Sequence, residues 1–155
     1  MGFQTQVNAL QAPATAGDFA SQNPRANVLA SPGQLIAPAG GLIVGNFAFV
    51  NPTTGVVSQA YTAGDLIGFL ARNSQGLITV FLADSSQVVP EGFMVTLMDK
   101  GDYYAKFAVA APAAGVPVYA STTDGSAQVS ATGGVETQFV TARTGLAGEL
   151  VIISA

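Results

Sequence analysis

The stretch that decides the fold is SQVVPEGFMVTLMDKGDYYAKFAVA, residues 86–110. It contains three short apolar runs, at 86–92, 93–99 and 102–110, and each run is bounded by Pro, Gly or Asp. Runs of this length that are rich in Val, Phe and Tyr predict strands rather than helices. Lys100 and Gly101 separate two of the runs, and we expect a tight hairpin at this pair.

The same texture continues through the rest of the chain from about Leu35. Further apolar runs, each bounded by turn-forming residues, lie at 41–51, 64–73, 76–84, 116–121, 126–131, 135–143 and 148–154. Asp124-Gly125 lies between two of them and predicts a type I′ hairpin turn. Many short strands at regular spacing predict an all-β fold, either a small β-barrel or a β-sandwich of short antiparallel strands.

Two runs carry information on which faces are covered. In VETQFVTAR, residues 135–143, the odd-numbered positions share one face of a strand and the even-numbered positions share the other. Both faces are mixed in polarity, so the pattern leaves open which one is buried. The segment at 68–83 is apolar on both faces, which suits a central hairpin covered on both sides, or one with a face in a subunit interface.

The first 33 residues have a different composition. QAPATAGDFASQNPRANVLASPG, residues 11–33, is rich in Gly, Pro, Ala, Ser and Asn, and its charged residues are Asp18 and Arg25. Proline disfavours helix, so we expect an extended N-terminal arm at 1–33 followed by a single β-rich domain at 34–155. Phe19 is unusual in a solvated arm. It either folds back on the domain or anchors in a groove of another protein.

Composition narrows the range of partners. The chain has 49% hydrophobic and 9% charged residues, whereas a soluble domain has about 25% charged residues. We therefore expect other protein to cover much of this neutral surface. The net charge is −4 and the five Lys and Arg residues do not cluster, which argues against binding to nucleic acid. No run of 18 apolar residues is present, and we expect no membrane association.

Residue types that carry catalysis are scarce. The sequence has no Cys and no His, which are the usual ligands of structural metals and the usual bases. Asp99 and Asp102 flank a predicted turn, and turn formation explains them better than a cation does. Glu91 could in principle form an acid–base pair with Glu149 or Asp65, but nothing in the sequence marks such a pair. We expect no enzyme activity, no catalytic residue, no metal ligand and no cofactor.

In order along the chain, several segments resemble one family. They are 17–21 (GDFAS), 23–26 (NPRA), 41–50 (GLIVGNFAFV) and the block from Pro90 to Lys106, and 114–134 is similar to a segment of other small members. Together they resemble the structural cement proteins, also called decoration proteins, of tailed bacteriophage heads. The resemblance spans nearly the whole chain.

This resemblance implies a structural protein that is made in the host cytoplasm and lies on the outer surface of the phage head in the virion. There it would stabilise the shell by bridging neighbouring major capsid protein subunits. Its partners would be the major capsid protein and further copies of itself, as a trimer in preference to a dimer. The residues that we expect to contact the shell from the arm are Phe3, Val7, Leu10, Phe19 and Arg25. The guanidinium of Arg25 would bind a carboxylate of the shell protein.

Tyr103 and Tyr104 are the candidate interface aromatics. Because they are adjacent in a predicted strand, one should face inward and one outward. The outward ring either anchors an interface or lies on the sheet. An alternative function is a carbohydrate- or receptor-binding β-sandwich module of a phage tail or virion surface, with Tyr61 completing an aromatic platform. The absence of Trp argues against this alternative.

Overall fold

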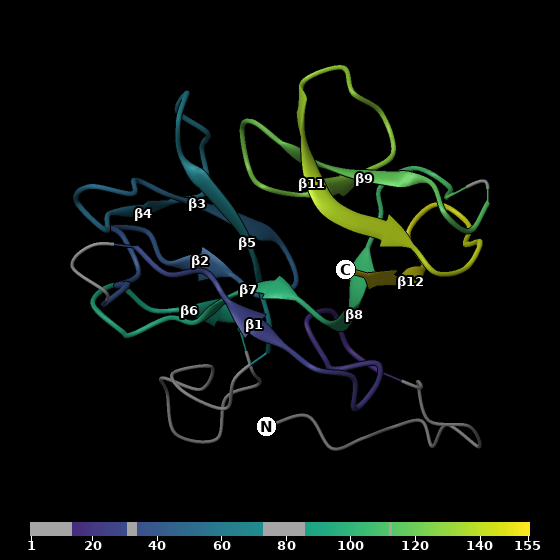
Figure 1. Ribbon diagram of the computed structural model, residues 1–155, viewed down its shortest axis with the longest axis horizontal. Coiled ribbons are helices and arrows are strands. Elements are labelled where there is room, and N and C mark those ends of the chain that lie inside the picture. Colours follow the sequence, from purple (N-terminus) through teal and green to yellow (C-terminus); the bar gives the residue numbers. More distant parts are fainter. Residues whose placement is uncertain (1–13, 31–33, 73–85, 112) are drawn as a thin grey trace, which may run out of the picture.

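The computed structural model describes residues 14–30, 34–72, 86–111 and 113–155. Within these ranges all regular structure is β, as predicted, and the strands are short (Figure 1). The strands are β1 Ala26–Asn27, β2 Leu42–Ile43, β3 Phe47–Val50, β4 Val57–Ser58, β5 Leu66–Leu70, β6 Val88–Val89, β7 Leu97–Lys100, β8 Asp102–Lys106, β9 Pro117–Ser121, β10 Ala127–Gln128, β11 Gly134–Thr141 and β12 Leu150–Ser154. The expected strand at 76–84 lies outside the described residues.

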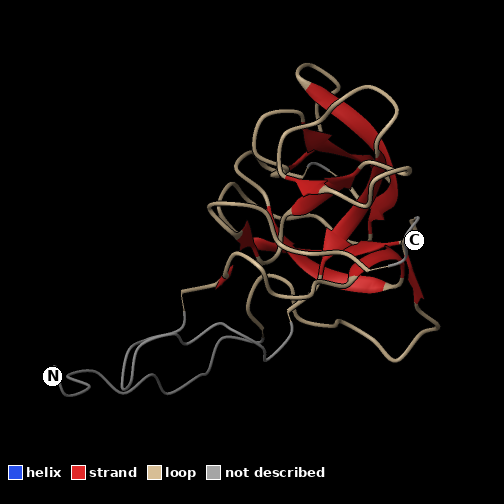
Figure 2. Cartoon of the chain, turned by 90° about the vertical axis from the view of Figure 1, so that its left-hand side faces the viewer, coloured by secondary structure: helices blue, strands red, loops and turns tan. Residues whose placement is uncertain are grey.

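The strands of the described residues form three antiparallel sheets. One five-stranded sheet has the order β1-β7-β5-β3-β4, and the other has the order β10-β9-β11-β12-β8. We call them the N-sheet and the C-sheet. A third sheet contains β2 and β6. Figure 2 shows the strands gathered in one body, with the C-terminus at the end of a sheet strand. Of the two predicted architectures, the molecule is a β-sandwich.

The main core lies between the N-sheet and the C-sheet and is built around aromatic rings. Phe47 and Phe69 come from the N-sheet, and Tyr103 and Phe139 come from the C-sheet. Ring centroids are 5.7 Å apart for Phe47 and Phe139 and 5.1 Å apart for Phe69 and Tyr103. Contacts at these distances hold the two sheets face to face.

The N-sheet is covered on both faces. All four residues of β3 are buried. Phe47 and Phe49 belong to the main core, whereas Ala48 and Val50 belong to a second core that includes Leu42 of β2. A strand that is apolar at every position therefore occupies a central layer, with the β2–β6 sheet on its outer side.

The hairpin expected at Lys100-Gly101 is wrong. β7 pairs with β1 and β5, whereas β8 pairs with β12 of the other sheet. Gly101, at φ 126°, turns the chain from one sheet to the other, and its N–H donates to the carbonyl of Ala155 at 3.2 Å. The turn residues specify a bend, but the strand that each flank pairs with depends on where Leu97 and Tyr103 are buried, and they enter different cores.

The hairpin at Asp124-Gly125 is present, but its turn type was predicted wrongly. β9 pairs with β10 in register Ala120 with Ala127. A type I′ turn needs positive φ at both central residues, and among the described non-glycine residues only Gln87 has one. Gly125 has φ 68°, while the Asp124 carboxylate accepts hydrogen bonds from the N–H and the hydroxyl of Ser126. A longer loop with a side-chain cap replaces the two-residue turn.

The alternation in residues 135–143 now has a direction. Phe139 and Thr141 are buried, and Val135 and Thr137 are half-buried on the same face. The even-numbered residues, including Glu136, face solvent. Hydroxyl groups on the inner face are satisfied by carbonyls, as for Thr141 with Ala113 at 2.7 Å, so a mixed face can still be the buried one.

Candidate interaction surfaces

The two adjacent tyrosines have different surroundings. Tyr103 is fully buried in the main core, and its hydroxyl donates to the carbonyl of Lys100 at 2.9 Å. Burial raises the pKa of Tyr103 above its usual value near 10.0. Tyr104 is half-buried on the other side of β8. One ring thus faces inward and one outward, and Tyr104 is the one with surface to offer a partner.

Residues 17–20 pair with β8 on the edge that β12 leaves free. The N–H of Gly17 donates to the carbonyl of Tyr104 at 2.7 Å, and the N–H of Tyr104 donates to the carbonyl of Asp18 at 3.0 Å. The N–H of Ala20 donates to the carbonyl of Asp102 at 2.9 Å. The described part of the expected arm is therefore extended but folded back, and β1 further along it pairs with β7 of the N-sheet.

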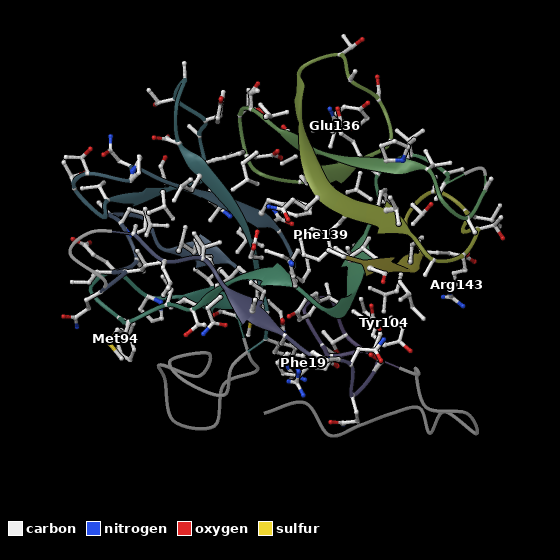
Figure 3. All side chains as sticks on the ribbon, in the orientation of Figure 1. Phe19, Met94, Tyr104, Glu136, Phe139 and Arg143 are labelled. Carbon is white, nitrogen blue, oxygen red and sulfur yellow. The ribbon has the colours of Figure 1, made fainter. Side chains whose placement is uncertain are left out.

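Phe19 and Arg25 contact each other at the surface. The Phe19 ring lies 5.5 Å from the Tyr103 ring, and the Arg25 guanidinium carbon lies 4.0 Å from the Phe19 ring centroid. Figure 3 shows Phe19 at the edge of the C-sheet, beside β8. Phe19 therefore folds back on the domain and still keeps 40% of its surface exposed. Phe3, Val7 and Leu10 lie outside the described residues.

Asp102 fastens the N-terminal segment to β8. Its Oδ2 atom accepts hydrogen bonds from the Ser21 hydroxyl at 2.5 Å and from the Asn23 side-chain amide at 2.5 Å. Hydrogen bonds from Ser154, Ser21 and Asn23 lower the pKa of this carboxyl below its usual value of 3.8, against a smaller opposing effect of burial.

Other carboxylates considered at the sequence level bind neutral donors. Asp99 accepts from the Gln138 side chain at 2.9 Å, and Glu149 accepts from the N–H of Leu146 at 2.9 Å. Asp65 accepts from the N–H of Thr62 at 3.1 Å. Among the described residues, no three carboxylate, His or Cys side chains gather in a way that could hold a metal ion.

An exposed row of apolar side chains crosses the outer layer. Ile36 is paired with Val56 on one side and with Met94 on the other, so the three residues lie directly opposite one another and share a face. Their neighbours Leu35, Val57 and Val95 are buried. Val56 and Met94 are 62% and 60% exposed. We call Val56, Ile36 and Met94 the apolar row.

A second exposed apolar site lies where the segments at 109–111 and 144–146 meet. Ala111 and Gly145 form an isolated bridge. Leu146 follows Gly145 and Val109 lies two residues before Ala111, and these two side chains are 68% and 60% exposed. We call Val109 and Leu146 the loop pair. Arg143 is three residues before Leu146 in the chain. Met94 and Arg143 lie toward opposite ends of the molecule's longest axis (Figure 3). The two apolar sites are therefore far apart.

Comparison with known proteins identifies the family. The family model described as XM1 gp53 minor capsid protein matches residues 3–155, nearly the entire chain. The chain belongs to this family.

Solved structures agree at the level of the fold. A chain from the structure titled "The capsid of Myoviridae Phage XM1" matches this member of the XM1 gp53 family with a TM-score of 0.70 and 21% sequence identity. The match covers 99% of this chain and 97% of that chain. No curated protein matches the sequence.

Membership in the XM1 gp53 family makes the protein a structural component of a phage capsid and hence of the virion. This confirms the resemblance to accessory capsid proteins. Such a role suggests a protein without catalytic activity. In the described part of the chain, no helix is long and apolar enough to cross a membrane.

Sequence reasoning did not single out the apolar row. One feature of the sequence could have pointed to it. Apolar side chains occupy both alternating faces of the three segments around Ile36, Val56 and Met94, which are QLIAP, GVVS and FMVT. In a strand covered on one face only, that pattern leaves a row exposed.

Proposed function

We propose that this capsid protein acts as a cement protein, which binds the outer surface of the head and bridges neighbouring major capsid protein subunits. The observation that supports this most is the pair of separated apolar sites. A protein that holds two subunits together needs two contact surfaces that face different neighbours, and exposed apolar patches rimmed by polar residues are typical of such contacts. The apolar row and the loop pair meet this requirement.

The low charge of the chain supports the same proposal. A surface with 9% charged residues has little electrostatic repulsion to overcome when it docks on a shell. Weak apolar contacts also gain from the many copies that a symmetric shell presents. We expect trimers in preference to dimers, and a density map of the particle that shows which symmetry axis carries this protein would test this expectation.

Only part of the N-terminal arm is available for contacts with the shell. Because residues 17–20 pair with β8, removing residues 1–25 would also open the domain edge. Removing residues 1–13 leaves this pairing in place and tests the contacts that we propose for Phe3, Val7 and Leu10. Phe19 and Arg25 remain at the surface as a stacked pair, from which the guanidinium can also reach a shell carboxylate.

The alternative, a carbohydrate- or receptor-binding module, gains no support from the aromatic residues. Tyr103 is buried in the core, and Tyr61 packs against Phe49 with ring centroids 5.2 Å apart. Tyr61 and Tyr104 are both half-buried, so none of the three rings considered is exposed in the way that a stacking platform for a sugar requires.

The decisive experiment measures binding of the purified protein to expanded heads that lack it. In the double variant Val56→Asp and Met94→Asp, both changes are at exposed positions, so the fold should tolerate them. We expect head binding to weaken by at least about tenfold, because charge is introduced into an apolar contact. Thr132→Asp, on an exposed loop away from both apolar sites, is the control. Unchanged binding of the double variant would exclude the apolar row as a shell contact.

A further inference from the structure

A groove runs between the N-sheet and the C-sheet on the side opposite β9. It is lined by 27–29, 65–67 and 136–139 together with Asp99, so that β1, β5, β7 and β11 all contribute to its walls. Figure 3 shows Phe139 and Glu136 on the β11 side of this region. We call it the inter-sheet groove. It shares no residue with the apolar row or the loop pair.

Both long walls of the inter-sheet groove are strand edges with incomplete pairing. On β11, β12 pairs only with Val140 and Thr141, although the strand begins at Gly134. On β5, β7 pairs only with Phe69 and Leu70, although that strand begins at Leu66. Figure 1 shows β9 on one side of β11 and β5 on the other. The parts of both strands without a second neighbour in the described chain therefore line the groove.

Among the described residues that line the groove, three are acidic and none is basic. Asp65, Asp99 and Glu136 are among its lining residues, and that lining contains no Lys or Arg. Asp65 and Asp99 accept hydrogen bonds from neutral donors, a backbone N–H and an amide. The ion pair found among the described residues, between Asp18 and Arg72, lies elsewhere.

The groove also exposes apolar side chains at its rim. Leu29 is 81% exposed and Leu66 is 38% exposed, while Phe139 is buried at the base. An extended segment adds to a strand edge through main-chain hydrogen bonds and places alternate side chains into pockets. The unpaired strand edges, the carboxylates and the exposed leucines of the groove therefore suit an extended peptide segment with cationic and apolar side chains.

We propose that the inter-sheet groove binds an extended segment of another capsid protein in which Lys or Arg alternates with apolar side chains. The segment adds as a strand beside β11 and β5, its cations bind Asp65, Asp99 and Glu136, and its apolar side chains cover Leu29 and Leu66. A second copy of this chain fits less well, because its net charge is −4 and two of its five cations, Arg25 and Arg72, already contact Phe19 and Asp18. The proposal rests on the capsid role but not on bridging by the apolar row.

The first test uses two labelled probe peptides and the purified full chain. The peptides are TVRVRVT and TVEVEVT, and binding is followed by fluorescence anisotropy at low and moderate salt. We expect the arginine peptide to bind at least about tenfold more tightly than the glutamate peptide, and added salt to weaken it. Equal binding of the two peptides, or no binding of the arginine peptide, would overturn the proposal.

Matched variants locate the binding. Glu136→Gln and Glu91→Gln remove the same charge from two exposed glutamates, one inside the groove and one outside it. The first should weaken the arginine peptide by about tenfold and the second should leave it unchanged. Leu29→Ser, at a position that is too exposed to affect folding, should also weaken it. An equal effect of the two glutamine variants would refute the assignment to this groove.

Assembled heads supply the natural occupant. A photo-crosslinking amino acid at Leu29 should join the chain to a segment of another capsid protein that contains Lys or Arg between apolar residues. A crosslink to a second copy of this chain, or to a segment without a cation, would overturn the proposal. If Glu136→Gln loses the peptide while head binding still depends on Val56 and Met94, the two proposals are shown to be separate. Loss of either one leaves the other intact.

Discussion

At the scale of single residues, Gly125 connects the two halves of the sandwich. It lies in the loop between β9 and β10 of the C-sheet, and its carbonyl accepts a hydrogen bond at 2.7 Å from the N–H of Phe47 in the N-sheet. With φ at 68°, it occupies a conformation that favours glycine. A methyl group at this position would also collide with the carbonyl oxygen of Phe47. Two independent constraints therefore act on this one residue.

Gly125 and Gly133 make a matched pair that separates these constraints. Gly133 also has φ 68°, but a methyl group there would meet nothing within 4 Å. Gly133→Ala should cost about 1–2 kcal/mol from backbone strain alone. Gly125→Ala should cost at least about 3 kcal/mol or prevent folding, because the collision adds to the strain. Urea unfolding followed by circular dichroism measures both. If both variants lose the same free energy of unfolding, the added methyl group at residue 125 avoids the carbonyl oxygen of Phe47 at no cost.

Phe139 and Val140 offer a second comparison between neighbours on one strand. Phe139 packs against Phe47, Phe69 and Tyr103, whereas Val140 faces outward. Phe139→Ala should lower the free energy of unfolding by about 3–5 kcal/mol, since it empties the centre of the main core. Val140→Ala should lower it by less than about 1 kcal/mol. Urea unfolding followed by circular dichroism measures both free energies of unfolding. Similar losses for the two variants would mean that the buried and exposed faces of β11 are misassigned.

At the scale of elements, the N-terminal segment completes the C-sheet. Residues 17–20 cover the free edge of β8, and Asp102 holds the segment through Ser21 and Asn23. An uncovered edge strand is a site for unwanted pairing with other chains. The segment that composition suggested was a free arm therefore protects an edge, and its attachment depends on an ionised carboxylate.

The attachment should depend on pH. Because the folded pKa of Asp102 is lowered, ionisation of this group stabilises the fold above its unfolded pKa near 3.8, and this contribution is lost as the pH falls through the lower folded value. Asp102→Asn should therefore be less stable than the wild type at pH 7, by about 1 kcal/mol because the group is largely solvated. The difference should shrink toward zero well below pH 3.8. Unfolding curves at both pH values, together with hydrogen exchange of the amides of Gly17 and Ala20, test this. An equal difference at both pH values would contradict it.

The elements also show what the sequence could and could not predict. Short apolar runs between turn formers predicted most strands, because local propensity and turn chemistry act over a few residues. The run at 41–51 predicts one strand but divides into β2 and β3 around Gly45, whose φ is 86° and which packs against Ala16 and Gly17. That division depends on a contact with a distant segment. The pairing of β7 and β8 with different sheets has the same origin.

The candidate sites follow the same rule. The capsid role was accessible from ordered motifs such as those at 17–26 and 90–106, because they are contiguous in sequence. The apolar row was not, since Val56, Ile36 and Met94 come from three separate segments and meet only through pairing. The inter-sheet groove likewise brings Asp65, Asp99 and Glu136 together from three strand regions. The spacing of these residues in the sequence therefore predicts neither the apolar row nor the inter-sheet groove.

At the scale of the whole molecule, the sandwich separates its surfaces by distance. The main core packs the two sheets face to face, with the N-sheet and the C-sheet toward opposite ends of the longest axis (Figure 1). Met94 of the apolar row and Arg143, three residues before Leu146 of the loop pair, lie toward these opposite ends (Figure 3). Rigid packing between the sheets would transmit force from one contact to the other. This layout makes the proposed bridging testable separately from binding.

Bridging predicts that either end alone suffices for attachment but not for stabilisation. A variant altered at the loop pair, Leu146→Asp, and the variant altered at Val56 and Met94 should each still occupy heads when supplied at saturating concentration. Neither should raise the temperature at which heads release DNA, because a protein held at one end cannot oppose the separation of two subunits. The wild-type protein should raise it, and a variant altered at both ends should bind more weakly than either one-end variant, since linked contacts add through effective concentration. Dye access to DNA during heating measures release, and quantitative gels measure occupancy. Full stabilisation by either one-end variant at equal occupancy would show that the protein strengthens single subunits and does not bridge them.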